Sequence, residues 1–162
     1  MGMRDTLAEL MTRQAKADPS FIVLTGDHGD ALFREYRGRY PGQFLNCGIA
    51  EQNMVGVAAG LYKTGFTPVV YGLAAFVPMR VMEQIKLDIC FSPKRVVFIG
   101  DGAGTEMYGS LGASHQCVED VECLRTLPQM TIYEPETPEE LKMAFNGALT
   151  LHGPSYIRIS QR

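Results

Sequence analysis

The sequence lacks tryptophan, paired-cysteine motifs, long apolar runs and a surplus of basic residues. Its 162 residues include no Trp, and 15 Lys and Arg stand against 18 Asp and Glu, for a formal net charge of −3. Without a basic surplus or a basic stripe, the chain is not expected to bind nucleic acid. No apolar run approaches the ~20 residues that a membrane-spanning helix needs, and no secretory signal opens the chain, so we expect no membrane partner.

The four cysteines, at positions 47, 90, 117 and 123, show no Cys-x-x-Cys spacing and stand in apolar surroundings. Buried free thiols in a reducing compartment are the simplest interpretation, so we expect a cytoplasmic protein. No other His or Cys lies at ligand spacing from His115, which argues against a zinc site.

What the sequence does contain is ordinary for a globular protein, with 46% hydrophobic and 20% charged residues. A chain of this length can bury roughly 70% of its unfolded surface. We find no internal repeat, low-complexity tract or linker. Residues 1–162 are therefore expected to form one domain.

Short apolar runs alternate with segments of helical periodicity. We expect strands at 21–27, 44–48, 67–72, 95–101, 130–135 and 155–160, and helices at 3–18, 50–63, 76–90, 115–127 and 137–151. Thr137 is placed to cap the last helix. One face of the helix over 76–90 is apolar, through Val77, Val81, Ile85 and Ile89. Strands that alternate with helices predict an α/β fold with a mostly parallel central sheet flanked by helices.

The segment Gly100–Gly104 ("GDGAG") follows a predicted strand and resembles the start of a magnesium-diphosphate motif. Mg²⁺ needs several oxygen ligands, and that motif requires an Asn further along the chain. The downstream stretch 124–133 contains no Asn, and the glycines do not complete a GxGxxG fingerprint. We therefore interpret Gly100–Gly104 as a turn that binds no metal.

Glu51 and His115 are the candidate catalytic residues. Glu51 stands at the start of the helix over 50–63, among small residues. It is either a first-turn glutamate stabilised by the helix dipole or a carboxyl group that exchanges a proton where another surface comes close. His115, at a loop-to-helix junction, is structural or catalytic, and Glu119 one turn later could support it or form a simple helix pair. The residues alone leave these alternatives open.

The segments around these two residues resemble the pyrimidine-binding domain of transketolases, particularly the separate C-terminal chain of split transketolases. The likeness runs through 44–65 ("FLNCGIAEQNMVGVAAGLYKTG"), 76–90, 112–140 and 153–160 in one collinear order. It implies the thiamine-diphosphate pyrimidine-binding fold. It also implies the small subunit of a split, thiamine-diphosphate-dependent enzyme that transfers a two-carbon or acyl unit between carbonyl compounds.

The resemblance implies roles for three residues. Glu51 occupies the place of the family's catalytic glutamate, which hydrogen-bonds the pyrimidine ring nitrogen of thiamine diphosphate. That contact lets the exocyclic amine of the cofactor take the proton from its thiazolium carbon. His115 matches the active-site histidine near the reacting carbonyl group, and Asp27 matches an aspartate near the edge of the cofactor.

The family also stacks aromatic residues on the aminopyrimidine ring. Phe76 matches one of them, and the two other cofactor-binding positions fall on Leu73 and Met79. Here the resemblance therefore implies an apolar platform with a single aromatic ring.

Positions that bind substrate in the family depart from its pattern. Counting back from His115, a phosphate-binding histidine falls on Ala103 and a hydroxyl-binding aspartate on Leu111. A phosphate-binding arginine falls on Gln161, beside Arg162. Because an apolar side chain cannot hydrogen-bond a sugar hydroxyl, we expect a reactant other than an ordinary sugar phosphate.

The resemblance implies that this chain shares thiamine diphosphate with a diphosphate-binding subunit, which would hold Mg²⁺. We expect at least a heterotetramer in which this chain also self-associates, with small carbonyl compounds as substrates. Within enzymes, the alternative is the analogous subunit of a 2-oxoacid dehydrogenase or a deoxyxylulose-phosphate-synthase-like enzyme. A non-catalytic assembly or regulatory relative is another alternative, and the intact Glu51 and His115 argue against it.

Overall fold

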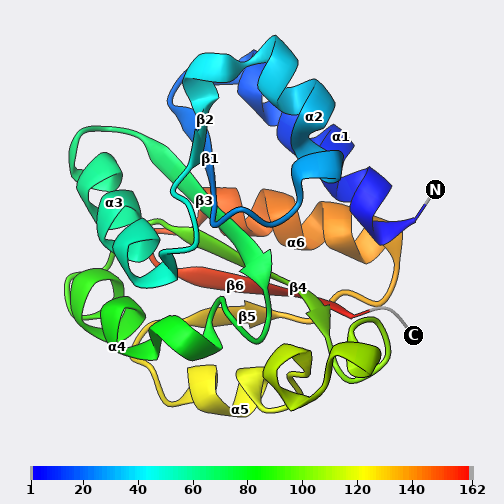
Figure 1. Ribbon diagram of the computed structural model, residues 1–162. Helices are drawn as coiled ribbons and strands as arrows, with labels where there is room; N and C mark the ends of the chain where they lie inside the picture. The colour runs from blue at the N-terminus through cyan, green and yellow to red at the C-terminus, as the bar shows by residue number, and fades with distance from the viewer. Residues whose placement is uncertain (1, 161–162) are drawn as a thin grey trace.

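The computed structural model describes residues 2–160, apart from the side chain of Asp30 (Figure 1). Six strands form one sheet in the order β2-β1-β3-β4-β6-β5, and all neighbouring strands are parallel. The strands are β1 (Phe21–Thr25), β2 (Phe44–Asn46), β3 (Thr67–Leu73), β4 (Val97–Ala103), β5 (Thr131–Tyr133) and β6 (Ser155–Ser160). The predicted α/β fold with a parallel central sheet is confirmed.

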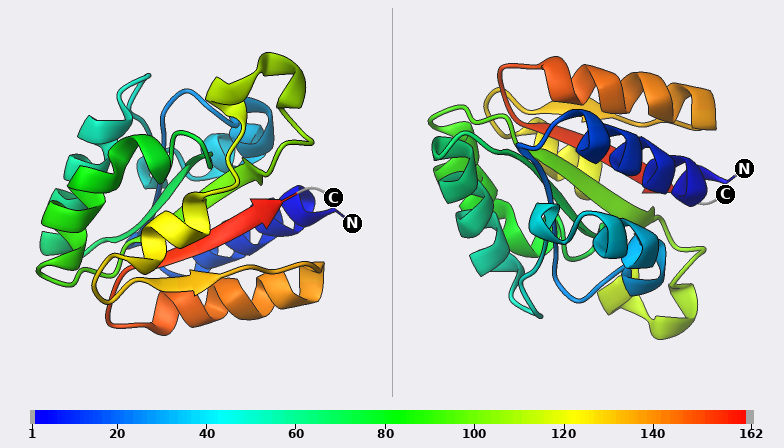
Figure 2. Two further views of the ribbon diagram at one scale, coloured as in Figure 1. Left: turned by 90° about the horizontal axis from the view of Figure 1, so that it is seen from below. Right: turned by 90° about the horizontal axis from the view of Figure 1, so that it is seen from above.

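Helices cover both faces of the sheet. They are α1 (Met3–Ala17), α2 (Asp30–Arg39), α3 (Glu51–Lys63), α4 (Met82–Gln84), α5 (Asp120–Arg125) and α6 (Pro138–Thr150). Buried side chains of α1, α2 and α6 form one hydrophobic core, and those of α3, α5 and the helical segment Ile85–Cys90 form another. Figure 2 shows α1 and α6 side by side on one face. Within residues 2–160, no helix is long and apolar enough to cross a membrane.

The central strands β1, β3 and β4 are buried along their whole length. Along β1, Phe21 and Val23 enter one core, whereas Ile22 and Leu24 enter the other. Strands covered on both faces need apolar side chains at successive positions. This is why β1 and the middle of β3 appear in the sequence as continuous apolar runs, whereas β4 also contains the buried Asp101.

The segment predicted as one helix over 76–90 is helical only from Met79. A 3-10 turn (Met79–Val81) leads into α4 and then into a π-helical turn (Ile85–Cys90). The prediction of its apolar face is confirmed, because the four residues are 0% exposed: Val77, Val81, Ile85 and Ile89.

The helix predicted over 115–127 is much shorter, because α5 begins only at Asp120. Cys117 instead forms an isolated antiparallel bridge with Gly104. The buried Asp120 carboxylate accepts hydrogen bonds from Tyr156 Oη at 2.6 Å and from Arg158 Nε at 3.0 Å. Tertiary contacts with Gly104, the residue after β4, and with β6 therefore decide where this helix starts.

The interpretation of Gly100–Gly104 as a turn is wrong, because β4 continues to Ala103 with an irregular register after Asp101. A Cβ at Gly100 would collide with the Tyr156 ring. Gly102 has a φ of 64°, and a Cβ there would lie 2.5 Å from Tyr108. Close packing of β4 against the rings of Tyr156 on β6 and of Tyr108 thus accounts for both glycines.

Two further expectations need correction. The sequence predicts no helix between 28 and 43, yet α2 lies there and buries Phe33 and Tyr36. All four thiols are free as predicted, but burial holds only for Cys90 and Cys117. Cys47 and Cys123 are half-buried.

Candidate functional site

Glu51 is the first residue of α3, which follows β2 at the carboxyl edge of the sheet. In parallel α/β sheets this edge is where ligands bind. The residue is only 7% exposed, and a Cβ added at Gly26 would lie 3.6 Å from its Cγ. The carboxylate Oε1 accepts a hydrogen bond from Arg80 Nη1 at 3.1 Å. Glu51 is therefore a nearly buried carboxylate balanced by one arginine.

The same arginine connects Glu51 to two other predicted residues. The Arg80 guanidinium carbon lies 4.0 Å from the centroid of the Phe76 ring. The Phe76 and His115 rings meet edge to face, with centroids 5.2 Å apart. The structure thus brings Glu51, Phe76 and His115 into one continuous row through Arg80. Along the chain, Glu51 lies 29 positions before Arg80, and His115 lies 35 positions after it.

Sequence reasoning missed Arg80. The available signal is weak: Arg80 follows Phe76 by four positions, a spacing that brings side chains together on a helix. In the structure the segment between them is not a regular helix, yet the cation–π contact forms. No sequence pattern connects Arg80 to Glu51.

A cavity of about 370 Å³ lies over the start of α3. Its lining residues are Ile49, Ala50, Glu51, Gln52, Asn53 and Arg80. Ile49 is 78% exposed, more than any other large apolar side chain among the described residues. A nearly buried carboxylate and an open apolar side chain, with the Phe76 ring adjacent through Arg80, suit a flat ligand with a hydrogen-bonding nitrogen.

The other predicted cofactor residues lie around this row. Asp27 follows Gly26, has a φ of 64°, and its N–H donates to Asn46 Oδ1 at 3.1 Å. Leu73 ends β3 and is only 4% exposed, so it offers little surface to a ligand. Met79 is half-buried against Ala74, Ala103 and Cys117.

The positions that depart from the family's substrate-binding pattern differ in exposure. Ala103 is 2% exposed at the end of β4, whereas Leu111 is 57% exposed. Gln161 and Arg162 lie outside the described residues.

A second polar group surrounds Asp101, which is 0% exposed. Its Oδ2 accepts hydrogen bonds from Arg4 Nε at 2.9 Å and Tyr71 Oη at 2.6 Å, and His28 Nε2 lies 3.6 Å away. Burial raises the pKa of Asp101, but the neighbouring His28, Arg4 and Tyr71 side chains outweigh it and hold the pKa at about 2. This carboxylate, on β4, therefore links α1 through Arg4 and β3 through Tyr71.

Metal ligation finds no support in the part of the chain that the structure describes. No group of three or more His, Cys, Asp or Glu side chains there is placed to hold a metal ion. Asp101, the acidic residue of the GDG segment, is already engaged by Arg4 and Tyr71.

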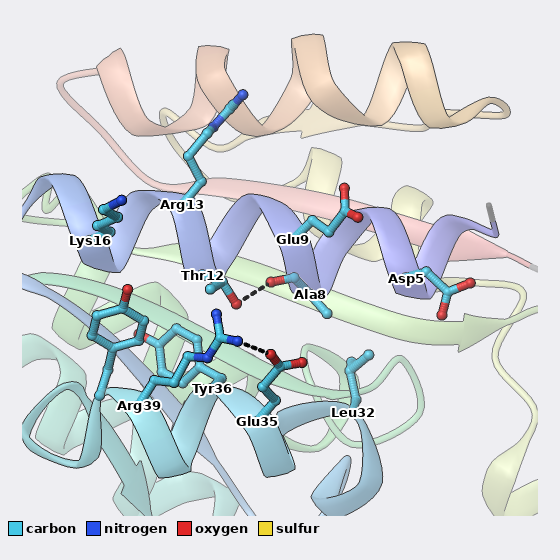
Figure 3. Close-up of a pocket in the computed structure, with 11 residues that line it drawn as sticks. Asp5, Ala8, Glu9, Thr12, Arg13, Lys16, Leu32, Glu35, Tyr36 and Arg39 are labelled. Atoms are coloured by element: carbon cyan, nitrogen blue, oxygen red, sulfur yellow. Dashed lines mark hydrogen bonds and ion pairs between the residues drawn. The ribbon is translucent and has the colours of Figure 1, made fainter.

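A larger cavity of about 570 Å³ lies elsewhere, between α1 and α2 (Figure 3). Charged side chains of both signs line it, and two of them, Arg39 and Glu35, pair with each other at 2.5 Å. None of the predicted site residues borders it. The smaller cavity at Glu51 remains the better candidate, because a nearly buried carboxylate lines it and Arg80, which also lines it, contacts the Phe76 ring.

The whole chain, residues 1–162, matches the protein family described as the transketolase pyrimidine binding domain. The 6-deoxy-6-sulfo-D-fructose transketolase subunit SqwH of Clostridium sp. (strain MSTE9) is 34% identical over 99% of this chain and 50% of its own length. An apulose-4-phosphate transketolase subunit of Phocaeicola vulgatus is 35% identical over 97% of this chain and 49% of its own. The 1-deoxy-D-xylulose-5-phosphate synthase of Clostridium acetobutylicum is 34% identical over 91% of this chain and 24% of its own.

A solved structure described as "Split gene transketolase, inactive beta4 tetramer" is also similar. Its TM-score is 0.84 at 31% identity, over 98% of this chain and 51% of that chain. The chain thus spans about half the length of the two transketolase subunits and of this structure. These likenesses confirm the resemblance to the C-terminal chain of split transketolases, and the chain belongs to the family of transketolase pyrimidine-binding domains.

Proposed function

We propose that this chain is the pyrimidine-binding subunit of a transketolase-like, thiamine-diphosphate-dependent transferase, in which Glu51 activates the cofactor. The observation that carries the proposal is the buried Glu51 carboxylate at the start of α3, in one row with Phe76 and His115. The relatives named as transketolase subunits support the transferase class.

The residues fit one end of thiamine diphosphate. Glu51 offers a carboxylate oxygen to the aminopyrimidine ring nitrogen, and Phe76 offers an aromatic face beside a cavity of about 370 Å³. The diphosphate end, which needs Mg²⁺ and several oxygen ligands, finds no such set within residues 2–160. A partner chain would supply it.

When bound, thiamine diphosphate supplies a carbon nucleophile that carries a two-carbon or acyl unit between carbonyl compounds. Glu51 would hold the proton at the ring nitrogen, in a site where low polarity strengthens that hydrogen bond. In His115, Nδ1 lies 3.0 Å from Ser114 Oγ. That contact leaves Nε2 to exchange a proton with the oxygen of the reacting carbonyl group.

A partner surface is available on α3 and the neighbouring π-helical turn. Gly56 and Gly60 are exposed, and a Cβ at either would meet nothing within 4 Å. Leu87 and Phe91 are 53% and 63% exposed. We propose that the diphosphate-binding chain and a second copy of this chain cover such surfaces in a heterotetramer. The words "inactive beta4 tetramer" for the similar split transketolase support the need for a second kind of chain.

A synthase of the deoxyxylulose-phosphate type is the second candidate, because such an enzyme is 34% identical over 91% of this chain. The two candidates differ in their donor: a ketose for a transketolase, a 2-oxoacid for the synthase. Leu111 at the sugar-hydroxyl position would favour a donor with fewer hydroxyl groups. Turnover of xylulose 5-phosphate, fructose 6-phosphate and pyruvate by the reconstituted enzyme separates the candidates.

The test of the cofactor role is Glu51→Gln in the chain reconstituted with its diphosphate-binding partner. The amide keeps the shape of the side chain but cannot exchange a proton, so turnover should fall by about two orders of magnitude or more. Glu9→Gln on α1, an exposed glutamate away from the site, is the matched control and should keep full turnover. Unchanged turnover in Glu51→Gln would refute the proposal.

A further inference from the structure

The Arg80 side chain contacts both groups that an aminopyrimidine ring would need, the Glu51 carboxylate and the Phe76 ring. The Arg80 guanidinium donates to Glu51 Oε1 at 3.1 Å and lies 4.0 Å from the Phe76 ring centroid. Arg80 also lines the cavity over the start of α3. A ligand that stacks on this face of Phe76 and hydrogen-bonds Glu51 therefore meets Arg80 in its place.

The chemistry of the guanidinium explains this placement. It is planar, carries N–H donors at its edge, and stacks on aromatic rings. Those are the properties by which an aminopyrimidine ring would be recognised by a carboxylate and an aromatic face. Arg80 thus satisfies a buried carboxylate that would otherwise be left without a partner, which is costly.

We propose that Arg80 is a stand-in for the aminopyrimidine ring, which neutralises Glu51 in the unloaded subunit and has to leave when the cofactor binds. This inference rests on the proposed function and adds a residue that controls loading of the same site. Arg80 competes with the cofactor, so it weakens cofactor binding.

The position of Arg80 allows it to leave. Its side chain is 45% exposed, against 8% for Glu51, so the guanidinium can turn into solvent without burying its charge. It sits in the short turn Met79–Val81, before the irregular helical segment, rather than within a long regular helix. Because the guanidinium itself is open to solvent, its ion pair and its cation–π contact are each weak, so together they weaken cofactor binding by about three- to tenfold.

The experiment is a calorimetric titration of thiamine diphosphate with Mg²⁺ into the chain assembled with its diphosphate-binding partner. Arg80→Met removes the charge and the planar donor while keeping an unbranched stem, and should tighten binding by about three- to tenfold. Arg80→Lys keeps the charge but not the planar group and should fall between wild type and Arg80→Met. Arg39→Met on α2, which breaks a surface ion pair with Glu35, is the control and should leave the affinity unchanged.

The outcomes separate the two proposals. Equal or weaker binding in Arg80→Met, with normal binding in wild type, overturns the role of Arg80 and leaves the proposed function standing. Absence of binding in wild type and every variant overturns both. Thermal unfolding verifies that each variant is folded, and if Arg80→Met is not, the affinity of Arg80→Lys relative to wild type decides.

Discussion

Replacing Asp101 by asparagine should remove a measurable part of the pH dependence of folding. The pKa of this buried carboxyl is about 2 in the folded chain, against its usual value of 3.8. At about 1.4 kcal/mol per pKa unit, the difference corresponds to about 2 kcal/mol of folding free energy. Because Asp101 is 0% exposed, solvent screening reduces this value little.

The sign follows from which state binds the proton more tightly. The unfolded chain takes up the proton near pH 3.8, whereas the folded chain keeps the carboxylate until about pH 2. The stabilisation is therefore fully present above pH ~5 and is lost as the pH falls toward 2. At pH 7, Asp101→Asn should lower the free energy of unfolding by about 3 kcal/mol, because Arg4 and Tyr71 then meet a neutral amide with a single acceptor oxygen in place of the carboxylate.

Urea unfolding of wild type and Asp101→Asn between pH 7 and pH 2 measures the effect. The difference between their unfolding free energies should shrink by about 2 kcal/mol over this range. Asp88→Asn, which removes an exposed aspartate, serves as the control for the loss of one negative charge. Two parallel curves for wild type and Asp101→Asn would refute the reasoning, because the carboxylate would then not be stabilised by its partners.

Two further predictions concern a helix cap and the thiols. Thr137 Oγ1 accepts a hydrogen bond from Glu140 N at 3.2 Å. Thr137→Ala should therefore lower the free energy of unfolding by about 1 kcal/mol. A change below ~0.3 kcal/mol in urea unfolding would contradict a capping role. Burial raises the pKa of Cys117 to about 12, with Asp120 and Glu119 adding to it, and burial raises the pKa of Cys90 to about 11. Iodoacetamide at pH 8 should therefore modify the half-buried Cys47 and Cys123 first, and mass spectrometry of the modified protein measures the order. Equal modification of Cys117 in the folded protein would count against its burial.

The strands were predictable because a strand that is buried on both faces needs apolar residues at successive positions, and this pattern is visible in the sequence. Every residue of β1 and β3 is buried, so both contain uninterrupted apolar stretches, 21–24 and 68–71, that stop shortly before Gly26 and Gly72. The start of α3 was predictable to within one residue. The local sequence was sufficient in these places.

The errors lie where distant residues decide the local structure. Cys117 pairs with Gly104, and Asp120 is fixed by Tyr156 and Arg158, so 115–119 do not form the helix that their sequence favours. The glycines of GDGAG accommodate the Tyr156 and Tyr108 rings rather than form a turn. No local pattern records such contacts.

In the candidate site too, some residues could be identified from the sequence and one could not. Glu51, Phe76 and His115 could be selected through the family resemblance, and the structure places them in one row. Arg80, which connects them, depends on a contact with Glu51 across 29 positions of sequence. That contact requires the fold itself.

The edges of the sheet have a consequence for aggregation. The outermost strands, β2 and β5, contain only three residues each. So short an edge exposes few unpaired N–H and C=O groups, and a second sheet cannot extend the ladder over any useful length. Although nearly half of the chain is hydrophobic (46%), strand-to-strand polymerisation is therefore disfavoured, and stable association has to form through helices and loops.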